Sequence, residues 1–139
     1  MLRLKTVVMW VVVVAALSKV GVLLFAHSGG SEKKVFEARL PNVPGMTLTA
    51  VVVEYPPGGK SPAHHHAGSV FAYVLTGEIR SRNSATGPVR IYRAGETFFE
   101  PPGSDHTISD NASTTKPASL LAVFVAEDGS VLTKPGPSK

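Results

Sequence analysis

The sequence predicts an all-β domain of antiparallel strands, arranged as a sandwich, a jelly roll or a barrel. Three observations favour this class. Short runs rich in β-branched and aromatic residues follow one another from residue 34 onward, and turns rich in Gly, Pro and Asn separate them. No stretch after residue 30 has the apolar period of a helix. Crossover helices, which parallel strands need, are therefore not expected.

Eight segments have the composition of strands, at close and regular spacing. The turns between them, such as PPGGKSP (56–62), supply residues for tight turns and positive φ angles. In chain order, the expected strands are 34–40, 48–55, 69–77, 78–82, 89–95, 97–100, 106–109 and 119–127.

Two of these strands contain runs that are apolar on both faces, VFAYVL (70–75) and LLAVFV (120–125). Such strands are usually covered on both sides, so a second sheet should cover one face. A partner in a homodimer is a natural cover for the other face, and a terminal strand or loop is the alternative. Four aromatic residues are expected in the core, with a pocket wall as the alternative: Phe71, Tyr73, Phe98 and Phe99.

The N-terminal segment, 1–28, has the pattern of a secretory signal peptide. A basic start, MLRLK (1–5), precedes the apolar run 7–17, and Ala26 and Ser28 have the spacing that a signal peptidase prefers. The alternative is an uncleaved anchor helix, because apolar residues resume later in the segment and together span about a bilayer thickness. In both cases the folded part is periplasmic or secreted, or anchored outside the cytoplasm, and only this segment meets the membrane. A cytoplasmic protein with a misassigned start is the third alternative.

The chain of 139 residues, 43% apolar, has room for one domain with a single core. The predicted organisation is a signal peptide or anchor at 1–28, a linker at 29–34, the β domain at 35–132 and a tail at 133–139. The tail, TKPGPSK, has two prolines and no apolar residue, so disorder is expected.

The charge of the chain argues against nucleic acid as a partner. The formal net charge is +4, but Arg3, Lys5 and Lys19 lie in the N-terminal segment. Of the 14 basic residues, 11 therefore remain in the body of the protein, against 10 acidic residues. A net charge of +1 provides no excess to neutralise phosphates.

Three of the five histidines are adjacent in the sequence. On a strand, alternation projects His64 and His66 to one face and His65 to the other, so the first two can bind one metal ion. His106 follows a Pro and Gly turn, and it would complete a set of three nitrogen ligands if its strand lies beside the first. The chain has no cysteine, so a metal site would use nitrogen and oxygen ligands. His65 and His27 are expected at the surface.

Two segments match the motifs of a known family. GKSPAHHHAGSVFAYVLTG (59–77) resembles the first cupin motif, with Val70 in place of its glutamate. GETFFEPPGSDHTISD (95–110) resembles the second motif, with Asp110 at the final asparagine position and Asn111 immediately after it. The residues of the second motif that are in register are Gly95, Pro101, Gly103 and His106.

The resemblance implies a cupin jelly-roll β-barrel, also called a double-stranded β-helix, that often dimerises. It also implies a metal ion held between the sheets by the two histidines and the glutamate of motif 1 and by the histidine of motif 2. Carried over to this chain, the metal ligands are His64, His66 and His106. The cofactor is then a divalent transition metal, with iron expected first and zinc, manganese, nickel or copper as alternatives.

The missing glutamate affects the charge at the site. Three neutral imidazoles leave a divalent ion with its full charge of +2, which favours an anionic chelating substrate or hydroxide. Some cupin dioxygenases resemble this chain in using only three histidines. Glu100 is a candidate replacement ligand, but we expect it to be an exposed carboxylate at the end of a strand. Ser69 is next to Val70, but alternation turns it away.

Two classes of function remain open at this point. The first is an extracytoplasmic metal-dependent enzyme that acts on a small molecule, by dioxygenase-like or Lewis-acid chemistry. The second is a non-catalytic module that binds a small ligand or a metal. The missing glutamate favours it, together with the lack of an obvious general acid or base near the motifs apart from Glu100 and Asp105. A purely structural protein is the third alternative.

Overall fold

The computed structural model describes residues 29–138, which contain eleven strands and no helix. All eight predicted strands are confirmed. The strands are β1 (Ser31–Arg39), β2 (Met46–Tyr55), β3 (Lys60–Ser61), β4 (His64–His66), β5 (Ser69–Thr76), β6 (Glu78–Asn83), β7 (Arg90–Arg93), β8 (Thr97–Glu100), β9 (Asp105–Asn111), β10 (Ala118–Glu127) and β11 (Thr133–Pro135).

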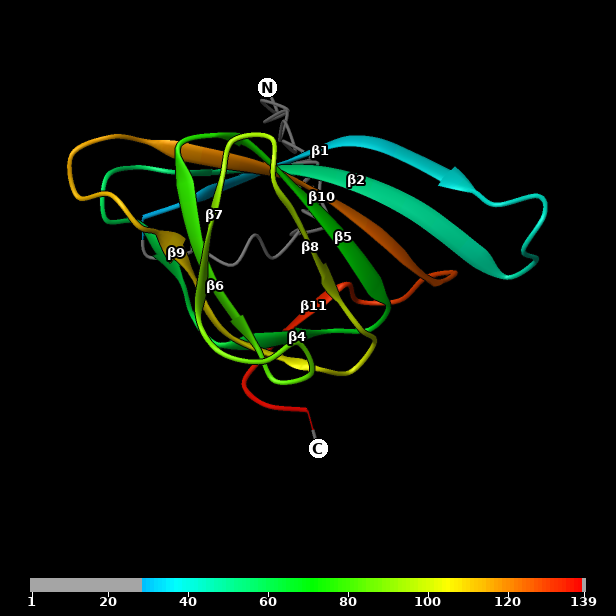
Figure 1. Ribbon diagram of the computed structural model, residues 1–139. Helices are drawn as coiled ribbons and strands as arrows, with labels where there is room; N and C mark the ends of the chain where they lie inside the picture. The colour runs from blue at the N-terminus through cyan, green and yellow to red at the C-terminus, as the bar shows by residue number, and fades with distance from the viewer. Residues whose placement is uncertain (1–28, 139) are drawn as a thin grey trace, which may run out of the picture.

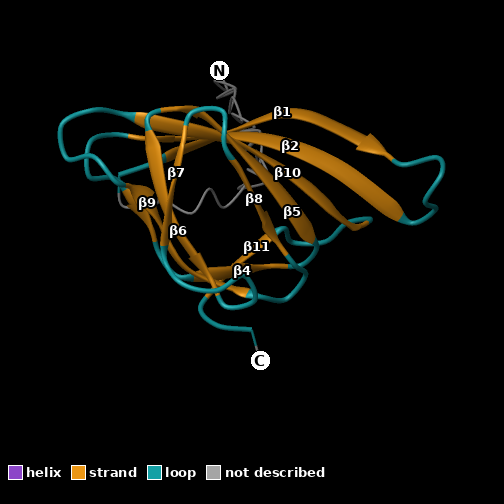
Figure 2. Ribbon diagram, viewed as in Figure 1, coloured by secondary structure: helices purple, strands orange, loops and turns teal. Residues whose placement is uncertain are grey.

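The strands form two antiparallel sheets that face each other (Figures 1 and 2). Sheet A has the order β1-β2-β10-β5-β8, and sheet B has the order β11-β4-β9-β6-β7, with β3 also paired to β9. Neighbours in sheet A that are far apart in sequence, such as β2 and β10, are typical of a jelly roll rather than a meander. The all-β class predicted from the sequence is therefore confirmed.

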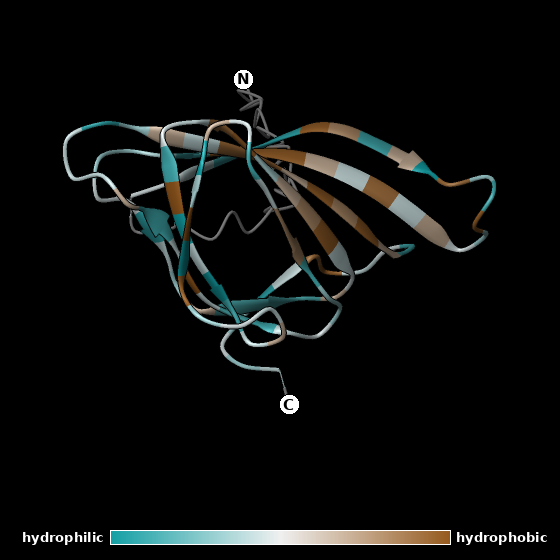
Figure 3. Ribbon diagram, viewed as in Figure 1, coloured by the Kyte–Doolittle hydropathy of each residue, from teal (hydrophilic) through white to brown (hydrophobic). Residues whose placement is uncertain are grey.

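The two sheets contribute different kinds of side chain to the interior. Sheet A supplies most of the apolar core, and its strands are correspondingly the more hydrophobic in Figure 3. The buried residues of β4 and β9 are polar. They are His64, His66, His106, Ser109 and Asn111. One wall of the interior is thus apolar, and the other carries polar side chains that can bind a ligand or take part in a reaction. The candidate site therefore lies at the polar wall.

The outer face of sheet A is also apolar, but it is open to solvent within the described part of the chain. Phe71, Tyr73 and Phe99 are 44%, 39% and 49% exposed, so their expected place in the core is wrong, and only Phe98 is buried. Alternation is the reason, because Val70, Ala72 and Val74 take the inward positions of β5. No residue of 29–138 provides the expected cover, and a homodimer through this face stays a prediction.

Two predicted boundaries are wrong. Strand β1 begins at Ser31, inside the segment expected to be a linker (29–34), where it pairs with β2. Strand β11 lies inside the segment expected to be disordered (133–139), where Thr133–Pro135 pair with β4. Both are edge strands, which are held mainly by backbone hydrogen bonds to one neighbour and need few apolar side chains.

The predicted signal peptide or anchor helix, 1–28, lies outside the described residues. Within residues 29–138, no helix is long and apolar enough to cross a bilayer.

Candidate metal centre

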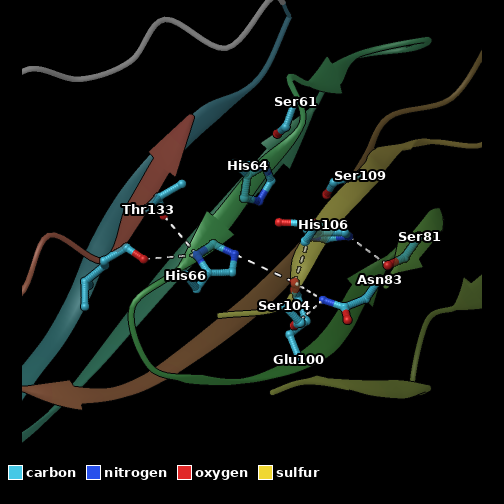
Figure 4. A network of polar contacts seen from close by, with 12 residues as sticks. Ser61, His64, His66, Ser81, Asn83, Glu100, Ser104, His106, Ser109 and Thr133 are labelled. Atoms are coloured by element: carbon cyan, nitrogen blue, oxygen red, sulfur yellow. Dashed lines mark hydrogen bonds and ion pairs between the residues drawn. The ribbon is translucent and has the colours of Figure 1, made fainter. Parts of the chain in front are cut away.

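The three predicted histidines lie together inside the domain. His64 and His66 are buried on the inward face of β4, whereas His65 lies on the other face and is only partly buried. Strand β9 pairs with β4 so that His106 is directly opposite His64. One ring nitrogen from each of the three lies within 4.8 Å of the others. The predicted pairing of the two motif strands is thus confirmed, and Figure 4 shows the rings converging.

Hydrogen bonds to backbone carbonyls fix the rings of the two motif-1 histidines. His64 donates from Nδ1 to the carbonyl oxygen of Pro62 at 2.7 Å, and His66 from Nδ1 to that of Leu132 at 3.1 Å. A carbonyl oxygen can only accept, so in each neutral ring Nδ1 carries the proton and Nε2 keeps a free lone pair. Thr133 Oγ1 also lies 3.2 Å from His66 Nδ1. This is the outer arrangement expected of metal-binding histidines.

Both nitrogens of His106 have partners. Its Nε2 atom lies 2.8 Å from Ser81 Oγ, and its Nδ1 atom lies 3.0 Å from Glu100 Oε2. The same carboxylate oxygen is 3.8 Å from His66 Nε2 and accepts a 3.2 Å hydrogen bond from Asn83 Nδ2. Glu100 therefore lies between two of the three histidines (Figure 4).

The expectation that Glu100 is an exposed carboxylate is wrong. Glu100 is 3% exposed, and it lies opposite Val70 in the register of β8 and β5. Both residues are on the inward face of sheet A, and Val70 is 1% exposed. A carboxylate thus reaches the histidines from the strand next to the one that carries the vacant glutamate position.

Burial keeps the motif-1 histidines neutral at ordinary pH. It lowers the pKa of His64 from 6.5 to about 4, although the hydrogen bond to Pro62 works in the opposite direction. Burial also lowers the pKa of His66. Burial alone would raise the pKa of Glu100, but the hydrogen bond with His106 and the electrostatic effect of the surrounding histidines outweigh it, so the net shift is downward. His64 and His66 therefore present neutral imidazoles beside the ionised carboxylate of Glu100, the protonation states in which these groups bind metals.

A cavity of about 110 Å³ separates the histidines from the apolar wall of sheet A. Phe98 and Phe124 form part of that wall. The ring of Phe124 packs edge-on against His66, with the ring centroids 5.1 Å apart. Such a space is small beside the ~300–1,000 Å³ of sites for drug-sized ligands. It fits a ligand of a few non-hydrogen atoms.

A cluster of hydroxyl groups lines the same cavity and was not predicted. Tyr55 Oη lies 2.7 Å from Ser61 Oγ and 3.0 Å from Ser109 Oγ. Burial raises the pKa of Tyr55, so its hydroxyl stays protonated. Ser61 and Ser109 lie within the first and the second motif segment, whereas Tyr55 lies outside both. The partners Ser81 and Asn83 lie on β6, outside both motifs, and no sequence pattern indicated them.

The residues present fit a divalent transition metal. Imidazole nitrogens suit iron, zinc, copper and nickel, and an oxygen ligand from a carboxylate suits manganese and iron as well. His64, His66 and His106 would hold such an ion, and it would supply Lewis acidity or redox chemistry there, depending on its identity.

The sequence profile of the cupin domain family matches residues 51–124, just over half of the chain. Among curated proteins, germin-like protein 5-1 of Oryza sativa subsp. japonica is 30% identical over 107 residues, which cover 70% of this chain and 46% of that protein. This chain therefore spans less than half the length of that relative.

Solved structures agree with the fold. A recombinant oxalate oxidase in complex with glycolate matches with a TM-score of 0.55 and 25% identity, over 70% of this chain and 51% of that one. A cupin-like protein from Thermotoga maritima matches with a TM-score of 0.60 and 17% identity, over 78% and 77% of the two chains.

Proposed function

The chain belongs to the cupin family, and from that premise we propose that it is an extracytoplasmic metal-dependent enzyme acting on a small molecule. One observation carries this proposal. The Nε2 lone pairs of His64 and His66 and a ring nitrogen of His106 converge beside a cavity, and protein groups hold the outer nitrogen of each ring. Arranging three buried imidazoles in this way costs desolvation, which a bound metal ion offsets.

The proposed cofactor is a divalent transition metal, with iron first and zinc, manganese, nickel or copper as alternatives. Such an ion supplies either Lewis acidity or chemistry with dioxygen, depending on its identity. We propose dioxygenase-like chemistry ahead of Lewis-acid chemistry. The solved oxalate oxidase with glycolate, at 25% identity, supports a small oxygen-rich acid as the class of substrate.

The residues around the cavity have separate tasks in this proposal. The hydroxyl groups of Tyr55, Ser61 and Ser109 orient a polar substrate at the histidine end of the cavity. Phe98 and Phe124 exclude water from the apolar wall. The small volume selects by size, because a larger ligand would have to displace buried side chains.

Location and assembly form a further part of the proposal. The signal-like sequence of 1–28 supports export, either by cleavage or with retention as an anchor. The exposed apolar face of sheet A supports a homodimer, because a contiguous apolar patch on a soluble protein usually marks an interaction site.

The first test is the metal content of the purified protein without a histidine tag, measured by plasma mass spectrometry. We expect close to one ion per chain, lost in the His64→Ala/His106→Ala variant and retained in the matched control His65→Ala. Identification of the metal then chooses between oxygen and Lewis-acid chemistry.

Turnover is tested separately, by oxygen uptake and product analysis with a panel of small hydroxy and dicarboxylic acids. Full metal occupancy without turnover of any panel member would favour the non-catalytic binding module. No metal in any variant, even after reloading with iron, manganese, nickel, copper and zinc, would overturn the proposal.

A further inference from the structure

We propose that Glu100 is a fourth metal ligand, and that the carboxylate of the site comes from β8 in this chain, directly opposite the position on β5 where the first cupin motif has its glutamate. The inference rests on the proposed metal-binding function. It changes the expected ligand set from three histidines to three histidines and one carboxylate.

The register of sheet A carries the first step of the argument. Val70 and Glu100 are direct partners in the antiparallel pairing of β5 and β8, and both are buried on the inward face. Side chains at such positions leave the sheet in the same direction, with Cβ atoms about 4.5–5.5 Å apart. A glutamate has three rotatable bonds, so from either position it can bring its carboxylate to the same histidines.

The contacts of Glu100 carry the second step. Its Oε2 atom lies 3.0 Å from His106 Nδ1 and 3.8 Å from His66 Nε2. Atoms that share one ion at about 2.0–2.2 Å are separated by distances of this order. Asn83 Nδ2, at 3.2 Å from the same oxygen and 2.8 Å from Ser104 Oγ, holds the carboxylate from outside. Ligating carboxylates typically have such a supporting hydrogen bond.

The third step is the chemistry of the buried positions. A buried carboxylate is costly unless it is paired or binds a metal. The partners of Glu100 at its inner end are the imidazoles of His66 and His106, and both of these side chains are buried as well. A valine in place of the motif glutamate fills the matching space on β5 without a second charge. One carboxylate therefore remains at the site, and a divalent ion there would carry a net charge of +1 and not +2.

The test exchanges the residues at positions 70 and 100. Binding of Co²⁺ to metal-free protein is measured by chelator competition, and its visible spectrum reports the number of ligands. We expect Glu100→Val to weaken binding by at least about tenfold, in line with the effect of disturbing even an outer partner of a ligand. We expect Val70→Glu/Glu100→Val to recover most of this loss, together with a spectrum like that of the starting protein. Glu127→Val, at the exposed end of β10, is the matched control.

The outcomes separate this inference from the proposed function. Tight binding by the starting protein, with equally tight binding and the same spectrum in Glu100→Val and Glu100→Gln, would overturn the inference and leave the three-histidine site standing. A folded exchange variant that binds as weakly as Glu100→Val would also overturn it, because the inference requires that a carboxylate at either of the two facing positions can reach the same ion. If the exchange variant does not fold, Glu100→Gln decides, since it preserves shape and hydrogen bonding and removes the charge. Absence of binding by the starting protein contradicts the proposed function instead.

Discussion

The protonation of each buried imidazole follows from its immediate neighbours. Because Pro62 and Leu132 present carbonyl oxygens to the Nδ1 atoms of His64 and His66, the inward nitrogens hold lone pairs before any ion arrives. His106 differs, because a hydroxyl group, which can donate or accept, faces its Nε2 atom. The ring of His106 is therefore the one whose ligand role depends most on a side-chain partner.

Loss of the Ser81 hydroxyl tests that dependence. In Ser81→Ala we expect metal affinity to fall by about 10- to 100-fold, the usual effect of removing an outer partner of a ligating histidine. Chelator competition measures the change, and Ser119→Ala, on the opposite sheet at the surface, serves as the control. Unchanged affinity in Ser81→Ala would show that this hydrogen bond does not orient His106.

The lowered pKa of His64 predicts how the stability of the metal-free protein depends on pH. The unfolded chain takes up a proton near pH 6.5, whereas the folded chain resists it down to about pH 4. The contribution is therefore fully present above pH 6.5 and is lost as the pH falls towards 4, and a shift of this size is worth roughly 3 kcal/mol. His66 acts in the same direction.

Urea unfolding of chelator-treated protein at pH 7 and pH 4 measures this loss. We expect the difference in unfolding free energy between the two pH values to shrink by roughly 3 kcal/mol in His64→Gln. A variant with the same pH dependence as the starting protein would contradict the assignment.

The sequence was sufficient to predict that the three histidines lie together, but not which groups surround them. His64, His66 and His106 have a spacing that strand alternation converts directly into geometry. The sequence predicts Glu100 at the surface, because a carboxylate at the end of a strand is usually solvated, and only the register with β5 reveals where the side chain points. Ser81 owes its role to the pairing of β6 with β9, which no local pattern specifies.

At the scale of the elements, the long strands were predictable from the sequence and the shortest strands were not. Long strands such as β2 and β10 have the composition and length that local patterns detect, whereas β3 and β11 are two and three residues long. These short strands form through backbone pairing with β9 and β4, a property of the assembled sheet.

The end of β9 differs by one residue from the expected alignment of the second motif. Asp110 was placed at the asparagine position, but it forms a bidentate pair with Arg80 at the surface. Asn111 is the buried residue, and its Nδ2 atom donates to the carbonyl oxygens of Pro56 and Lys116. Asn111 thus ties two loops together at the end of the barrel, which explains why an amide is needed at this end of the strand.

Because β10 packs closely against the chain just before β5, one methyl group added at Gly68 should lower the stability of the fold strongly. A Cβ atom at Gly68 would collide with the backbone oxygen of Val125 and lie 2.7 Å from the Cβ atom of Ala126. We expect Gly68→Ala to lower the free energy of unfolding by about 1–3 kcal/mol, as overpacking usually does. Because Gly68 lies two residues after the proposed ligand His66, we also expect weaker metal binding.

Chemical denaturation and chelator competition check both effects. Gly129→Ala is the comparison, since Gly129 has φ of +77° but nothing within 4 Å of the added atom. It should cost only the backbone strain, about 1 kcal/mol, and leave metal binding intact. Equal costs in the two variants would show that β5 can move away from β10 freely.

At the scale of the whole molecule, sheet A has apolar residues on both faces, and this predicts association. The exposed rings of Phe71 and Phe99 are direct partners across β5 and β8, and Val123 on β10 extends the same row. We expect the protein to sediment as a dimer at micromolar concentration, and Phe71→Lys/Phe99→Lys to sediment as a monomer that retains its metal.

A matched variant separates this face from general surface hydrophobicity. Ile91 on β7 of sheet B is 45% exposed, so Ile91→Lys should leave the dimer intact. A monomeric starting protein, or a dimer that persists in the double variant, would contradict the prediction.

The position of the candidate centre also links metal binding to the stability of the whole fold. The three histidines belong to sheet B and Glu100 belongs to sheet A, so one ion bound by all four would join the two sheets across the interior. A ligand that binds only the folded state stabilises it by about 2.7 kcal/mol at a hundredfold excess over its Kd. For a domain of this size that gain corresponds to an increase in Tm of roughly 10 °C.

Calorimetry of metal-free and reloaded protein measures this link. We expect the increase in Tm to persist in His65→Ala, to disappear in His64→Ala/His106→Ala, and to be clearly smaller in Glu100→Gln at the same metal concentration. The last comparison is the informative one, because an ion held by sheet B alone would stabilise the protein equally with and without the charge of Glu100. A full increase in Glu100→Gln would therefore mean that the two sheets are joined by their packing only.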